Sequence, residues 1–188
     1  MAKSVTGVHK VVYALLTEDS KTGTVYGTVK PLAPIIQIST EIATASETQY
    51  ADNVAYDTDT QIGETTLNME VPGLDSAVLR ELLGLEAVNG VTVFKADAKA
   101  PYVAVGYIGT RSDDTEICKW LLKGKFNVPS DDYSSKADGV EYKTTSLDAT
   151  FIPRESDKAF KVEADTADED FVGYATFFNA PFVAPVAP

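Results

Sequence analysis

Apolar and polar residues alternate along most of the chain, which is typical of β-strands with one buried face. Over residues 63–71, Thr65, Leu67, Met69 and Val71 alternate with Glu64, Thr66, Asn68 and Glu70. Over 117–128, one face carries Cys118, Trp120, Leu122, Gly124, Phe126 and Val128, while Lys119, Lys123 and Lys125 lie on the other. Residues 142–151 alternate in the same way. We predict three strands, the first with an acidic exposed face and the second with lysines that meet solvent or an acidic neighbour.

Further segments rich in Val, Ile, Thr, Tyr and Phe suit a pleated, half-buried surface. They are Gly7–Leu16, Thr24–Val29, Ile35–Thr44, Val91–Lys95, Pro101–Gly109 and Phe171–Phe178. One helix is predicted at about 75–83, where Leu74, Val78 and Leu82 recur every fourth residue, with Asp75 or Ser76 as the N-cap and Gly84 as the stop. One short helix among about eight to ten strands predicts a mainly β protein, a β-sandwich or barrel with the helix packed on its side.

The predicted organisation is a single β-sandwich domain over residues 1–178, with long polar loops at 45–61 and 129–139. Connections of that length in a compact domain are usually functional or ordered by a partner. Residues 179–188 contain three prolines and no charge, which predicts an extended arm lying on another surface. A frayed tail is the alternative for this end.

The 188 residues carry a formal charge of −12, which argues against binding to nucleic acid or to an anionic membrane. This charge is uneven along the chain. Residues 31–79 hold eight acids and no Lys or Arg, and residues 130–170 have a net charge of −7. Two acidic regions therefore flank a nearly neutral middle.

The sequence offers little support for catalysis. It has one histidine, His9, and one cysteine, Cys118, and no nucleotide-binding or zinc-protease motif. Asp57 and Asp59 could ligate a divalent cation, but the spacing of a calcium loop is absent and a solvated turn is favoured. We therefore predict no enzyme activity, no cofactor and no metal site, with a glycosidase-like hydrolase as a remote alternative. The N-terminus lacks an apolar signal region and no apolar run reaches membrane-helix length, so we expect folding in a reducing cytoplasm.

One stretch, residues 38–53, reads Ile-Ser-Thr-Glu-Ile-Ala-Thr-Ala-Ser-Glu-Thr-Gln-Tyr-Ala-Asp-Asn. It resembles a segment of the major tail proteins of long, non-contractile-tailed phages (siphophages) of Gram-positive bacteria, of the phi-13 type. The opening at residues 7–14, the helix that ends in Leu-Leu-Gly, the strand around Trp120 and the late Phe-Phe pair resemble the same family in the same order. The resemblance covers most of residues 5–180 and leaves residues 179–188 unmatched.

The resemblance implies a β-sandwich flanked by a helix, assembled into stacked hexameric rings that form a tail tube. Each subunit would add strands to a continuous barrel around a lumen, through which the genome passes during ejection without specific binding. The implied partners are other copies of the chain, together with the tape measure, baseplate or distal tail, and tail terminator proteins, with no membrane. The implied location is the virion tail, after a period in the host cytoplasm.

Two sets of residues are candidates within such a tube. Glu41, Glu64 and Glu70 are predicted to line the lumen, because an acidic wall repels phosphate. Candidates for contacts between rings are Tyr50, Asp52, Asn53, Tyr56 and Phe182. The alternative function is a surface- or carbohydrate-binding β-sandwich module, which requires a cluster of exposed aromatic residues on one face.

Overall fold

The computed structural model describes residues 3–130, 143–171 and 173–183, with the backbone alone for Tyr50 and Ala51. The strands among these residues are β1 (Val5–Ser20), β2 (Gly23–Tyr26), β3 (Lys30–Pro31), β4 (Gln37–Ala51), β5 (Val54–Val71), β6 (Glu86–Val88), β7 (Val91–Val93), β8 (Val103–Arg111), β9 (Glu116–Phe126), β10 (Thr145–Phe151) and β11 (Lys161–Asp165). The helices are α1 (Ser76–Leu83) and α2 (Tyr174–Phe177).

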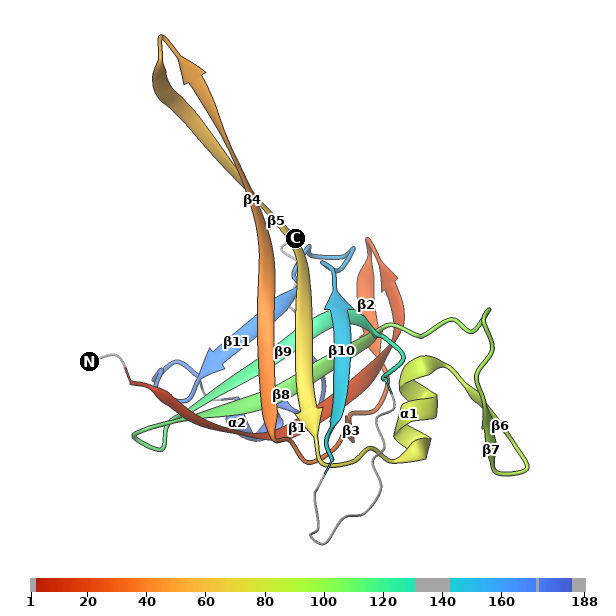
Figure 1. The fold of residues 1–188 in the computed structure, drawn as a ribbon. Coiled ribbons are helices and arrows are strands. Elements are labelled where there is room, and N and C mark those ends of the chain that lie inside the picture. Colours follow the sequence, from red (N-terminus) through yellow and green to blue (C-terminus); the bar gives the residue numbers. More distant parts are fainter. Residues whose placement is uncertain (1–2, 131–142, 172, 184–188) are drawn as a thin grey trace, which may run out of the picture.

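Most strands form one antiparallel sheet in the order β2-β1-β8-β9-β10-β5-β4, with β3 paired to β1 and β11 paired to β9. Figure 1 shows β4, β5 and β10 side by side in front of β8 and β9, which cross behind them at a steep angle. Strand β9 joins the two layers, because its first half pairs with β11 and its last residues pair with β10. The sheet thus folds over itself, which confirms the predicted mainly β, sandwich-like fold.

The main core lies between the two layers and is closed at one end by α1. Its buried residues are Val11, Tyr13, Leu32, Leu67, Met69, Val71, Leu82, Leu83, Val103, Val105, Tyr107, Leu121, Phe126, Leu147, Ala149 and Phe151. The alternation predicted for residues 65–71 is confirmed, since every second side chain of this part of β5 is buried. Gly124 is required here, because a Cβ atom at this position would lie 2.5 Å from the ring of Phe151.

A second apolar cluster covers the other side of β8 and β9. It contains Val12, Ala104, Ile108, Cys118, Trp120, Leu122 and Phe178. Strand β8 is therefore buried on both faces, which explains its unbroken apolar sequence. The prediction that alternate residues of β9 share one face is confirmed as far as Leu122. Phe126 instead belongs to the main core, because the pairing of β8 with β9 shifts register after Val103.

The predicted helix is confirmed at residues 76–83. The Asp75 carboxylate caps it by accepting the backbone N–H of Ala77 at 2.8 Å, and Gly84 ends it in the left-handed conformation, with φ of 65°. The strand predicted at 171–178 is wrong, because residues 174–177 form α2. This turn lets the Phe177 carbonyl accept the indole N–H of Trp120 at 3.0 Å while the Phe178 ring packs on the same indole.

The polar loop predicted at 45–61 is also wrong. Strands β4 and β5 pair along this whole stretch and are joined at Asp52 and Asn53, with φ of 51° and 64°. Positive φ at both central residues is the requirement of a type I′ hairpin turn, which Asp and Asn tolerate. Most of the loop predicted at 129–139, and the arm from residue 184, lie outside the described residues.

Candidate functional site

The three glutamates predicted to line a lumen lie on one exposed sheet face. In β5, Thr65 and Leu67 point into the core, so Glu64 and Glu70 point the other way. Glu41 of β4 is paired with Thr66 and therefore shares the outer face. The structure thus brings together residues that are up to 29 positions apart in the sequence.

The part of this outer face that β4, β5 and β10 form is acidic, and Lys125 of β9 lies at its border, in register with Thr150 of β10. Among the described residues, Glu41, Glu64 and Glu70 form no ion pair with Lys or Arg. Strand β10 adds a further acid, Asp148, which is paired with Asn68 and accepts a hydrogen bond from its side-chain amide. Sequence reasoning missed Asp148, because only the pairing of β10 with β5 brings it there. We define the acidic face as Glu41, Glu64, Glu70 and Asp148.

The second candidate feature is the distal part of the β4–β5 ribbon, Thr44–Ile62, which we call the distal hairpin. It begins where the register shifts between Ile42 and Thr44. Figure 1 shows it projecting well beyond the rest of the fold. Eight β4 residues at about 3.4 Å each give a projection of roughly 25 Å. Nearly all of its described side chains are exposed, so its backbone edges and side chains are open to a partner.

The distal hairpin combines acidic and apolar groups. Its acids are Glu47, Asp52, Asp57 and Asp59, and it contains no Lys or Arg. Val54, Tyr56 and Ile62 are 67%, 77% and 56% exposed. Four of the predicted contact residues, Tyr50, Asp52, Asn53 and Tyr56, lie at or near its turn. Exposed apolar residues on a projecting ribbon are typical of an interaction surface.

Phe182, the fifth predicted contact residue, lies elsewhere, in the segment that follows α2. The guanidinium of Arg154, which is fully buried, donates to the Phe182 carbonyl at 2.9 Å and to the Tyr26 hydroxyl at 3.3 Å. Its other nitrogens form a two-point contact with the Asp157 carboxylate. Pro181 is buried and the Phe182 side chain is 46% exposed. The first residues of the C-terminal arm are therefore fastened to their own subunit.

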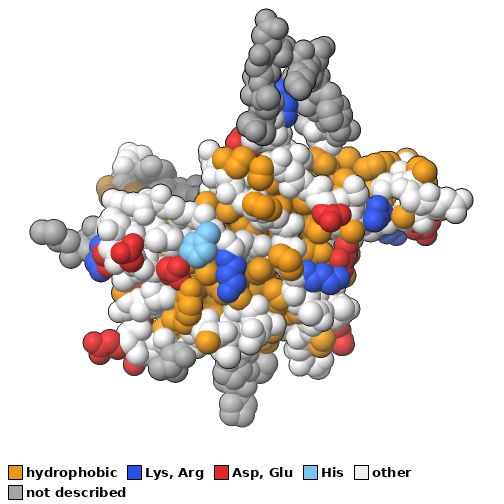
Figure 2. Space-filling view, turned by 90° about the horizontal axis from the view of Figure 1, so that it is seen from below, with side chains coloured by type: hydrophobic (Ala, Val, Ile, Leu, Met, Phe, Trp, Pro, Cys, Tyr) orange, Lys and Arg blue, Asp and Glu red, His pale blue; other side chains and the backbone are white. Residues whose placement is uncertain are grey.

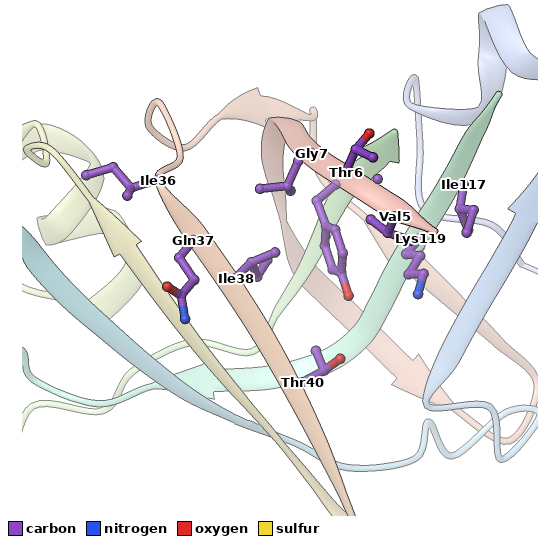
Figure 3. Close-up of a pocket in the computed structure, with 12 residues that line it drawn as sticks. Val5, Thr6, Gly7, Ile36, Gln37, Ile38, Thr40, Ile117 and Lys119 are labelled. Atoms are coloured by element: carbon purple, nitrogen blue, oxygen red, sulfur yellow. The ribbon is translucent and has the colours of Figure 1, made fainter. Parts of the chain in front are cut away.

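A groove of about 670 Å³ opens between the start of β4 and the first half of β1. In Figure 3, Ile36, Gln37 and Ile38 line one side of it, while Val5, Ile117 and Lys119 line the other. Val5 and Ile36 are 59% and 51% exposed although both are apolar. Figure 2 shows further hydrophobic side chains exposed around His9 on the underside of the molecule.

Ion pairs surround this groove along β9 and β11. The Nζ atoms of Lys119 and Lys161 lie 3.4 and 2.8 Å from one Glu163 oxygen. Burial raises the pKa of the Glu163 carboxyl, but the Lys161 hydrogen bond and the charges of both lysines outweigh it and hold this pKa below its usual range. Two ammonium groups thus share one carboxylate, which leaves one positive charge in excess.

His9 and Cys118 are both held in structural contacts. The His9 Nε2 atom lies 3.3 Å from a Glu116 oxygen, and its Nδ1 lies 3.3 Å from the Thr110 hydroxyl. Cys118 is buried, and this burial raises the pKa of its thiol to about 11. Over the described ranges, no three or more His, Cys, Asp or Glu side chains are grouped so as to hold a metal ion.

No protein-family model and no curated protein matches this sequence. Within the described part of the chain, neither helix has the length and hydropathy needed to span a bilayer. The described fold and surfaces define a mainly β, sandwich-like protein with an acidic sheet face, a projecting hairpin and a groove between β1 and β4.

Proposed function

We propose that this chain is a structural protein of a phage virion, which assembles into stacked, hexameric rings that form the tail tube. The single observation that carries the proposal is the distal hairpin. It extends roughly 25 Å from the body and exposes Val54 and Tyr56, for which the described part of the subunit offers no cover. A projecting, partly apolar ribbon is suited to contacts between copies of one chain.

The acidic face is a second observation that supports the same proposal. A wall that carries Glu41, Glu64, Glu70 and Asp148, which form no ion pair with Lys or Arg among the described residues, repels phosphate and disfavours adhesion of passing DNA. In the proposed tube this face lines the lumen, and DNA passes it during ejection. The tape measure, baseplate or distal tail, and tail terminator proteins would be the further partners of the tube.

The edge of the sheet is the third support. Strand β4 ends the strand order, so one side of its 15-residue backbone has no strand partner in the described part of the subunit. It contains no Lys or Pro within Gln37–Ala51, although these residues commonly protect an edge strand from pairing with another chain. Pairing of this edge with a neighbouring subunit would extend the sheet around the tube.

The carbohydrate-binding alternative requires aromatic side chains gathered on one surface. The strongly exposed aromatic residues of the described part are Tyr56, Phe94, Tyr174 and Phe182. Tyr56 lies on β5 and Phe94 follows β7, whereas Tyr174 and Phe182 belong to the segment from α2 onward, where Phe182 lines a pocket with Phe177. The tip of the distal hairpin lies apart from β7 and α2 (Figure 1), and this separation favours the assembly function over one flat sugar-stacking platform.

Negative-stain electron microscopy of the concentrated protein tests the proposal. We expect rings or tubes from the natural chain and none from Val54→Ser/Tyr56→Ser, which should keep the same circular dichroism spectrum because both residues are exposed. The matched control, Val88→Ser/Val91→Ser, removes two valines that are 56% and 63% exposed from the β6–β7 hairpin and should assemble normally. A natural chain that stays monomeric at all concentrations would refute the proposal.

The lumen assignment has its own test. A reconstruction of the tube by cryo-electron microscopy should place Glu41, Glu64 and Glu70 on the inner wall. Their location on the outer wall would overturn the lumen assignment, while the assembly function itself would stand.

A further inference from the structure

The groove between β1 and β4 has a partly apolar lining that no described segment of the subunit fills. Val5, Val8, Ile36, Ile38 and Ile117 supply its apolar lining, and two of them are more than half exposed at its mouth. Burying this surface would be favourable by about 25 cal/mol for each Å² removed from water. An occupant must therefore offer apolar side chains that fit a volume of about 670 Å³.

The charge beside the groove narrows the choice of occupant. Lys119 lines the groove, and within the described ranges Lys119 and Lys161 form ion pairs with one acid, Glu163. The other nearby bases are balanced one to one, since Arg111 pairs with Asp165 and Lys3 pairs with Asp113. In a chain with a net charge of −12, these four bases and three acids leave one positive charge in excess on the β9–β11 side of the groove. Its occupant should be acidic as well as apolar.

The distal hairpin has both properties. It carries four acids and no base, and Val54 and Tyr56 are its most exposed large side chains. Building on the function proposed above, we propose that the groove of one subunit receives the distal hairpin of a second copy of the chain. The apolar side chains near the turn enter the groove, while the hairpin carboxylates face Lys119 and Lys161.

A subunit cannot fill its own groove in this way. The groove contacts β4 at Ile36–Thr40, whereas the turn follows the other end of the same strand at Ala51. Thirteen residues of extended chain between Ile38 and Ala51 separate the two sites by up to about 45 Å. The hairpin of one copy must therefore reach the groove of the next.

The resulting contact is head-to-tail, because two different surfaces meet. Unless two copies exchange hairpins reciprocally or the contacts close into a ring, such an interface leaves one free hairpin and one free groove at every stage and propagates along an axis. This geometry provides the axial contact of a stacked assembly, with a rise per copy of at most about 45 Å.

Cross-linking tests the contact directly. A chain with Tyr56→Cys and Ile36→Cys, treated with a short bismaleimide, should give a ladder of covalent oligomers on a denaturing gel. The matched control, Tyr56→Cys with Val25→Cys, places the second thiol on β2 at an equivalent exposure of 52% and should give no ladder. The natural Cys118 is buried and stays unmodified in both folded chains.

Substitutions in the groove should also prevent assembly. Val5→Glu/Ile36→Glu adds carboxylates where the acidic hairpin would dock, and we expect at least a tenfold loss of tubes. Val25→Glu/Val88→Glu changes two valines of similar exposure outside the groove and should assemble like the natural chain. Thermal melts of the two variants should coincide, because all four positions are more than half exposed.

The outcomes separate this inference from the proposed function. Tubes without a Tyr56–Ile36 ladder would overturn the groove contact and leave the tail-tube function intact. A ladder in a protein that forms no ring or tube would support the contact and refute the tail-tube function. A ladder from Phe182→Cys/Ile36→Cys, with none from Tyr56→Cys/Ile36→Cys, would identify the C-terminal arm as the occupant and overturn the inference.

Discussion

The buried guanidinium of Arg154 offers a demanding test of how the C-terminal segment is held. The side chain makes four hydrogen bonds, two to Asp157 and one each to Tyr26 and the Phe182 carbonyl. Arg154→Met keeps most of the apolar stem and removes all four bonds. Breaking a buried ion pair from one side costs about 3–5 kcal/mol, because the remaining charge loses its partner.

The environment of Asp157 places the expected effect at the lower end of that range. Its side chain is 18% exposed and still accepts the Ala159 backbone N–H at 3.0 Å, so water and the backbone compensate in part. The Phe182 carbonyl recovers hydration once the arm detaches. We therefore expect the free energy of unfolding to fall by about 3 kcal/mol. For a chain of this size this corresponds to a melting temperature lower by roughly 6–12 °C.

Urea unfolding, followed by the fluorescence of the single tryptophan Trp120, measures this change in the free energy of unfolding. Hydrogen exchange measures how well the backbone amides of the C-terminal arm are protected. Amide protection at residues 182–183 should decrease in Arg154→Met. The control Lys21→Met removes an exposed base and should stay within about 0.5 kcal/mol of the natural chain. An Arg154→Met chain as stable as that control would show that the arm and the guanidinium contribute no coupled stability.

Three further outcomes follow from single contacts. Thr65→Val should raise the free energy of unfolding by about 1 kcal/mol in urea titrations, because the buried Thr65 hydroxyl has no hydrogen-bond partner among the described residues. Gly106→Ala should lower it by about 1–3 kcal/mol and shift Trp120 emission, since the new Cβ would lie 2.9 Å from the indole ring. Burial raises the pKa of Asp19, but hydrogen bonds from Lys123 and a backbone N–H outweigh it, so the folded-state pKa lies below 3.8. Its contribution to stability is therefore complete above about pH 4 and is lost as the pH falls through the folded-state pKa, so the advantage of the natural chain over Asp19→Asn should shrink below pH 4 in acid titrations.

The elements that depend on local pattern could be predicted from the sequence. The predictions of the strand around Leu67 and of the helix between Asp75 and Gly84 are confirmed. Both depend on signals within a few residues, namely the alternation of buried and exposed side chains and the capping of helix ends. The polar hairpin was missed because its Thr-rich strands bury neither face and so lack an apolar period. Its signal was the Asp52–Asn53 pair, whose side chains tolerate the positive φ of a tight turn.

Features that depend on strand register could not be predicted. After Leu122, the side chains of β9 that were predicted to share one face no longer do so, because the pairing with β8 shifts there. The alternation of residues in the sequence does not mark that shift. The missed strand β11 brings Glu163 against Lys119, which is 44 positions away in the sequence, and against Lys161, which is two positions away. The predicted acidic neighbour of the lysine-bearing face therefore exists, but only the register identifies it.

The structure divides the base-free stretch of the sequence, residues 31–79, into two surfaces with different physical demands. Glu41, Glu64 and Glu70 lie on the sheet, where carboxylates without an ion-pair partner among the described residues suit a surface that must repel phosphate. The acids of the distal hairpin project from the body, where the same charge opposes association unless a cationic surface receives it. A hairpin that is both acidic and apolar can therefore act as a contact only against a rim such as that of Lys119 and Lys161. Negative charge thus serves repulsion of DNA at the proposed lumen and attraction to lysines at the proposed contact. The register shift between Ile42 and Thr44 separates the sheet face from the distal hairpin.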